Sequence, residues 1–160
     1  MKYLDWKPKY ADDTLLVDAY KDMQGYSAAD ASSIPFIIQL FENPKYDFLR
    51  FGKVPGSIDL FGHDLIHILL GQDMSLPGEA YVIGYTMGST KQTTLIDRIL
   101  FKFVSQYFYP KNYRFDSHSL KHFEMGVDHG HNSDTVNLTT VDFDAILNQS
   151  LVDVRSLLNI

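Results

Sequence analysis

Apolar residues recur every three or four positions along most of the chain, and this spacing places them on one face of an α-helix. The first such stripe runs from Leu15 to Met23 and is followed by Gly25. Glycine, proline and capping residues separate the later stripes. The helices predicted from these signals cover residues 15–25, Ser27 or Ser33 to Glu42, 58–70, 76–88, 93–107, 117–125, and Thr140 or Asp142 to 158.

This pattern predicts an all-α protein, a single-domain bundle of about six or seven helices over residues 1–160. Residues 126–134 are polar and contain glycine, which favours a loop, and 135–140 could form a short strand without an evident partner. Gly84 and Gly88 are four apart, a spacing that permits close helix approach in a core or at a dimer seam. The apolar face expected on the helix at 93–107 consists of Leu95, Ile96, Ile99, Leu100, Phe103 and Val104.

Composition narrows the classes of function. The formal net charge is −6, which disfavours a nucleic-acid-binding role because such proteins need a basic face. There is no cysteine, so any bound metal must be held by nitrogen and oxygen. No stretch approaches the ~20 apolar residues that span a bilayer, and the first residues lack the features of a signal peptide. These features predict a cytoplasmic protein.

The most informative segment runs from Phe61 to Glu79. His63 and His67 are four positions apart, so a helix stacks their rings on one face, where two imidazoles can hold one metal ion. Gly71 ends this helix, and a turn and a new helix follow, with Glu79 in its first turn. An antiparallel return would bring Glu79 level with His67 as a third ligand. Alternatively, both histidines are core residues that bond to the backbone.

Asp64 is the fourth candidate ligand. It lies about 100° around the helix from His63, so it could bind the same ion, orient an imidazole or a bound water, or act as a proton acceptor. Two histidines with carboxylates suit Zn²⁺ best, and Fe²⁺ or Mn²⁺ are also compatible. The predicted metal site is therefore His63, Asp64, His67 and Glu79, with Asp64 as the candidate catalytic residue.

The pattern His63-Asp64-x-x-His67, eleven residues and then Glu79 resembles the motif of the coenzyme Q biosynthesis protein 4 family, which acts in ubiquinone biosynthesis. The flanking residues Gly62–Gly71 and the final stretch Leu147–Ile160 are similar to that family as well. The resemblance covers roughly Pro35 to Ile160 and suggests a divergent bacterial-type member.

The resemblance implies an α-helical fold and a metal ion on the four residues above. It also implies a hydrophobic cleft for a polyprenylated ring precursor, peripheral contact with the inner face of the cytoplasmic membrane, and a homodimer. The implied activity is removal of the C1 carboxyl group of a quinone precursor, or organisation of the other enzymes of the pathway. Such an enzyme would be a metal-dependent, oxidative decarboxylase.

Two further interpretations remain open. The chain could be a non-catalytic lipid-binding scaffold whose metal is structural. It could also be a zinc-dependent hydrolase, although Asp64 is short for the glutamate of the H-E-x-x-H pattern.

Other polar groups could also carry a function. A second site could involve His118 and His122, with His129 and His131 following, although a solvated polar helix and loop also fits them. The basic residues that could face anionic lipid are Lys102, Lys111, Arg114 and Lys121.

Overall fold

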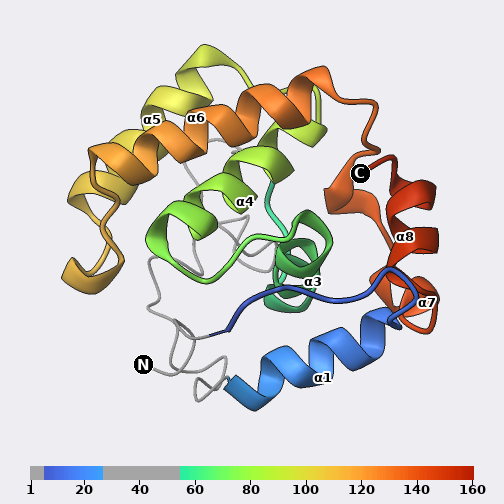
Figure 1. Cartoon of the computed structure of the whole chain (residues 1–160). Helices are drawn as coiled ribbons and strands as arrows, with labels where there is room; N and C mark the ends of the chain where they lie inside the picture. The colour runs from blue at the N-terminus through green and yellow to red at the C-terminus, as the bar shows by residue number, and fades with distance from the viewer. Residues whose placement is uncertain (1–5, 27–54) are drawn as a thin grey trace.

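The structure, a computed structural model, describes residues 6–26 and 55–160, and within these ranges all regular structure is helical (Figure 1). Leu15 and Ser150 form an isolated β-bridge, and the described ranges contain no strand. The predicted all-α fold is therefore confirmed, while the helix expected to end at Glu42 lies outside the described residues. The seven described α-helices are α1 (Leu16–Tyr26), α3 (Leu60–Leu70), α4 (Leu76–Ser89), α5 (Leu95–Tyr107), α6 (Ser117–Asn132), α7 (Phe143–Ile146) and α8 (Leu151–Leu158).

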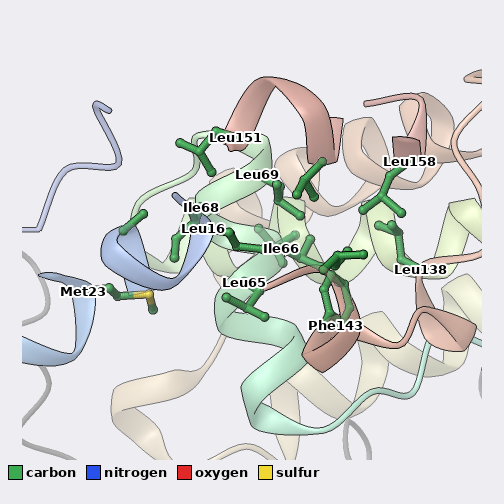
Figure 2. Packing of buried hydrophobic residues seen from close by; sticks show 14 of the residues in the cluster. Leu16, Met23, Leu65, Ile66, Ile68, Leu69, Leu138, Phe143, Leu151 and Leu158 are labelled. Atoms are coloured by element: carbon green, nitrogen blue, oxygen red, sulfur yellow. The ribbon is translucent and has the colours of Figure 1, made fainter. Parts of the chain in front are cut away.

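Helix α3 forms the centre of the larger of two apolar clusters. Its side chains at Leu65, Ile66, Ile68 and Leu69 are fully or almost fully buried. They pack against α1, α7 and α8, as Figure 2 shows for Leu16, Phe143, Leu151 and others. Each buried aliphatic side chain of this kind stabilises the fold by about 1.5–3 kcal/mol. The surroundings of α3 are therefore well-packed protein, which fixes its polar side chains in place.

Helices α4 and α6 pack with their backbones in contact. A Cβ added to Gly84 or Gly88 of α4 would collide with the carbonyl oxygen of Phe123 or Val127 on α6. Reciprocally, Gly126 and Gly130 of α6 face the carbonyl oxygens of Tyr81 and Tyr85 on α4. The close approach expected of Gly84 and Gly88 is thus confirmed, and the partner helix is α6 of the same chain (Figure 1).

The predicted loop at 126–134 is wrong, because α6 continues to Asn132. Gly126 and Gly130 suggested a loop in the sequence, yet in the structure they are the residues that let α6 approach α4. Tertiary contact therefore outweighs the weak helix propensity of glycine.

The C-terminal segment is also more divided than expected. Asp142 caps α7, as predicted, but the helix lasts four residues, and Ser150 caps a separate helix, α8. The short strand considered for 135–140 is absent, because Leu138–Thr140 forms a 3-10 helix, η5. The expected helix at 140–158 is thus two helices with a turn between them.

Arg155 of α8 fixes the C-terminal end of α3. Its Nε donates to the carbonyl oxygen of Leu69 at 2.9 Å, and a second guanidinium nitrogen donates to Ile68 O at 3.4 Å. These carbonyls belong to the last turn of α3, where carbonyl oxygens find few N–H donors within the helix. The guanidinium therefore holds the end of the helix that precedes the Gly71 turn.

The side of α5 that packs against the core differs from the side predicted from the sequence. Thr94 and Asp97 form a capping box at its start, and Phe101 and Val104 are buried. Ile99 and Phe103, expected on the same apolar face as Val104, instead point largely to solvent, as do Leu95 and Ile96. No helix among the described residues is both long and apolar enough to cross a membrane.

Candidate metal centre

The two histidines of the site lie on a tightly defined helix. Asp59 caps α3 by accepting the Gly62 N–H at 2.8 Å, and Gly71 ends it in the left-handed conformation with φ 65°. His67 has no exposed surface, and His63 is also buried. Their ring centroids are 4.8 Å apart, as the four-residue spacing predicts. The helix predicted to begin at residue 58 thus begins two residues later, at Leu60.

Glu79 comes to the histidines because the chain reverses sharply after Gly71. Asp73 accepts hydrogen bonds from the Ser75 N–H at 3.1 Å and from its hydroxyl at 2.6 Å. Ser75 in turn caps α4, with Pro77 in the first turn, so Glu79 lies one turn from the start of the helix. The prediction that this turn brings Glu79 level with His67 is confirmed, since Glu79 Oε2 lies 3.4 Å from His67 Nε2.

Three ligand atoms meet at this point. His63 Nε2 lies 3.0 Å from Glu79 Oε2, His67 Nε2 lies 3.4 Å from the same oxygen, and the two Nε2 atoms are 3.1 Å apart. Two ligands about 2.0–2.1 Å from a tetrahedral zinc ion are themselves about 3.3 Å apart. The triangle is therefore close to the size that a bound divalent ion requires. His63, His67 and Glu79 form a buried group that could hold a metal ion.

The proton on His67 is fixed by the backbone. His67 Nδ1 lies 3.1 Å from the carbonyl oxygen of Gln72. A carbonyl oxygen only accepts, so Nδ1 donates the hydrogen bond, and Nε2 is the ring nitrogen that faces His63 and Glu79. An imidazole held in this way is the usual arrangement of a metal-binding histidine.

The charge of Glu79 also suits a cation. Burial raises the pKa of its carboxyl, but the imidazoles of His67 and His63 outweigh this effect and hold the pKa well below its usual range. Glu79 is therefore an ionised carboxylate that lies beside two imidazole nitrogens. This donor set fits Zn²⁺ and related divalent ions.

Asp64 does not join this triangle. Its side chain is nearly buried, and its Oδ2 accepts a hydrogen bond from Gln24 Nε2 of α1 at 3.3 Å. Burial raises the pKa of Asp64 to about 6, although His63 and His67 act in the opposite direction. The structure therefore brings together three of the four predicted ligands and places Asp64 beside them. Its roles as ligand and as catalytic residue stay predictions.

The remaining histidines do not form a comparable group. His118 and His122 have the same 4.8 Å ring separation as the buried pair, but His118 is exposed and neither belongs to a cluster of three ligands among the described residues. His129 Nδ1 lies 2.8 Å from the hydroxyl of Tyr81, and His131 is exposed. The second site considered for these residues thus has no third ligand in the described part of the chain.

Two contributors were not predicted from the sequence. The Gln72 carbonyl follows from the turn at Gly71, so the left-handed glycine was a signal for it. Gln24 has no such signal, because its contact with Asp64 spans 40 positions.

Comparison with protein-family models, with curated proteins and with solved structures finds no match to this chain. The chemistry of the site therefore rests on its own residues.

Proposed function

We propose that this protein binds one divalent metal ion, with zinc preferred, through His63 Nε2, His67 Nε2 and a carboxylate oxygen of Glu79. The observation that carries the proposal is the 3.0–3.4 Å triangle of these three atoms. It is supported by the Gln72 carbonyl, which accepts a hydrogen bond from Nδ1 of His67 and so orients Nε2 toward the other two atoms.

Three protein ligands leave a position for a further group. Zinc sites that act on substrates have three protein ligands and one open position, whereas structural sites are closed by four. When bound, the ion would polarise a substrate carboxylate or lower the pKa of a water at that position. Asp64, adjacent to His63 in the sequence and nearly buried, is the residue proposed to hold or release a proton beside that position.

We extend the proposal to a substrate class on the basis of the sequence resemblance. The pattern His63-Asp64-x-x-His67 and Glu79 is similar to the motif of the coenzyme Q biosynthesis protein 4 family. The proposed ligand is an isoprenoid quinone precursor whose head-group carboxylate approaches the ion. The proposed activity is removal of that carboxyl group in quinone biosynthesis.

A second candidate is a non-catalytic scaffold with a structural metal. The burial of the site favours it, because His67 is inaccessible and the Glu79 side chain is only 26% exposed. A metal ion in a site this buried could stabilise the turn between α3 and α4 without taking part in a reaction.

The first test measures metal. The purified chain, stripped with a chelator and titrated with Zn²⁺, is expected to bind one equivalent, whereas His67→Ala loses this binding. His118→Ala is the matched control, because it also removes one member of a histidine pair at the same ring separation, and it is expected to bind zinc normally. Absence of binding to the wild-type chain would exclude the metal site.

The second test separates the two functions. A bacterium that lacks removal of the C1 carboxyl group in quinone synthesis is supplied with the wild-type chain or with His67→Ala, and the quinone is measured by mass spectrometry. Rescue by the wild-type chain alone supports an enzyme. Rescue by both favours the scaffold, and rescue by neither excludes the quinone proposal while leaving the metal result intact.

A further inference from the structure

A cavity of about 320 Å³ is lined by residues from three segments that are far apart in the sequence. They are residues 7–9, residues of the turn and helix start between 71 and 78, and His122 of α6. None of the proposed metal ligands is among the described residues that line it. The cavity is therefore a separate candidate site, although Gln72 belongs to its lining and also contacts His67.

The volume of this cavity suits a small molecule. It lies at the lower end of the roughly 300–1,000 Å³ that ligand pockets occupy. A water molecule takes about 30 Å³ of liquid volume, so the cavity has room for about ten waters or for a molecule with a similar number of non-hydrogen atoms. A diphosphate or a small phosphorylated compound has this size.

Two lysines reach the cavity from a well-anchored piece of backbone. The Lys9 N–H donates to the carbonyl oxygen of Lys7 at 2.7 Å, which closes a tight turn around Pro8. Trp6, just before this turn, is buried with 1% of its surface exposed, and its Nε1 donates to the hydroxyl of Tyr10, just after the turn, at 2.8 Å. The turn is therefore preorganised, so a ligand that binds there would order little backbone.

The charges at the cavity favour an anion over a cation. Asp73 is the one acidic residue among the described residues that line it, and its carboxylate is already engaged. Its Oδ1 accepts hydrogen bonds from the N–H and the hydroxyl of Ser75, and its Oδ2 accepts from Lys7 Nζ at 2.8 Å. Lys7 thus balances the charge of Asp73, which leaves Lys9 and the imidazole of His122 to meet a negative group.

A phosphate group fits this lining better than a carboxylate does. Phosphate oxygens accept charge-assisted hydrogen bonds on several sides at once, and here the ammonium groups and the imidazole come from different segments of the chain. The first turn of α4, with Pro77 and Gly78 at the cavity, adds the positive end of a helix dipole. The formal net charge of the chain is −6, so attraction of an anion would have to come from this local group of charges.

We propose that this cavity binds the phosphate or diphosphate group of a small soluble molecule through Lys7, Lys9 and His122. His122 thereby has a role that its pairing with His118 does not supply, since that pair belongs to no group of three metal ligands in the described part of the chain. The turn that lines the cavity also carries the Gln72 carbonyl, which contacts His67. The bound phosphate would therefore lie against the turn that positions the proposed metal ligands.

The test titrates inorganic pyrophosphate into the metal-free chain by isothermal titration calorimetry. Without a metal ion the pyrophosphate cannot be held by the proposed zinc site, so the result is independent of whether the chain binds zinc. The wild-type chain is expected to bind one equivalent. Lys9→Gln and His122→Ala should each bind roughly tenfold more weakly or worse, because each removes a donor to a charged group. The matched controls are Lys111→Gln and His118→Ala, which change exposed residues that do not line the cavity and should bind like the wild type.

Lysine acetylation by acetic anhydride, mapped by mass spectrometry, supplies a second measurement on the unmodified sequence. Pyrophosphate is expected to slow the acetylation of Lys7 and Lys9 and to leave that of Lys111 unchanged. Equal protection of Lys9 and Lys111, or equal affinity of all the variants, would mean general charge screening and would overturn the site. So would the absence of binding at millimolar pyrophosphate. Binding to phosphatidic acid vesicles alone, lost in Lys9→Gln, would overturn the soluble ligand in favour of a lipid headgroup.

Discussion

Gly88 of α4 lies against the carbonyl oxygen of Val127 on α6 so closely that a Cβ at position 88 would overlap it. Gly130 of α6 stands in the same relation to the Tyr85 carbonyl of α4. Both neighbours are helical backbone, which cannot rotate away as a side chain can. The orientation of α4, and with it the position of Glu79, therefore depends on four positions that carry no side chain.

Gly88→Ala is expected to reduce the free energy of unfolding by about 2–3 kcal/mol, the upper part of the usual range for overpacking. Urea denaturation measures this change. Zinc affinity should fall as well, because α4 must tilt away from α6.

Gly25→Ala is the control for this change, because a Cβ at position 25 meets no atom within 4 Å. This variant should be more stable than the parent by about 0.5–1 kcal/mol, since alanine favours the helix. Equal losses at the two positions would contradict the account of the α4–α6 contact.

Zinc is expected to raise the melting temperature of the chelator-treated protein. A ligand at 100 times its dissociation constant adds about 2.7 kcal/mol to the stability of the folded state, which corresponds to roughly 5–10 °C for a chain of this size. Differential scanning calorimetry measures this shift. His67→Ala should show none and His118→Ala the full shift, so a shift that survives in His67→Ala would mean binding elsewhere.

Asp64 is expected to make the metal-free protein less stable as the pH rises from about 4 to 6. Burial raises the pKa of this carboxyl from 3.8 to about 6, so the folded chain holds its proton more tightly than the unfolded chain. The stability that Asp64 contributes is thus complete below pH 4 and lost above pH 6. A difference of two pKa units corresponds to at most about 3 kcal/mol.

Asp64→Asn removes this titration and can still accept the hydrogen bond from Gln24. Urea denaturation in the presence of a chelator should show a flatter dependence on pH in this range than the wild-type chain. Parallel pH profiles of the two proteins would show that Asp64 keeps its ordinary pKa.

Arg155→Ala is expected to reduce stability by about 2–3 kcal/mol, because hydrogen bonds from a charged donor to Leu69 and Ile68 carbonyls are lost. Chemical denaturation again supplies the measurement. Asp12→Asn tests the other contact of this guanidinium, and because the Asp12 side chain is 78% exposed, a change of no more than about 0.5 kcal/mol is expected. A large effect of Asp12→Asn would assign the role of Arg155 to the ion pair.

The site could be predicted in good part because its determinants are local. The His63–His67 spacing, the Gly71 stop and the Ser75 cap fall within one short segment, and together they fix where Glu79 returns. The position of Asp64 could not be predicted in this way. Its hydrogen-bond partner Gln24 belongs to another helix. Whether Asp64 is a metal ligand or only lies beside the ligands depends on that contact.

The fold was predicted less evenly. Gly126 and Gly130 suggested a loop because a sequence does not reveal whether a helical glycine faces water or another backbone. For α5 the prediction chose the wrong side of the helix. Periodic apolar residues do not by themselves indicate which side of a helix packs against the core of the same chain. Phe101 and Val104 take that side, and Ile99 and Phe103 are left in water.

The bond between Arg155 and Leu69 joins positions that are 86 residues apart. During synthesis, the histidines and Glu79 leave the ribosome well before this arginine does. Contacts of such long range form late because they must wait for the intervening chain. The end of α3 is thus secured only once α8 has been made and docked, so stable metal loading should follow the docking of α8.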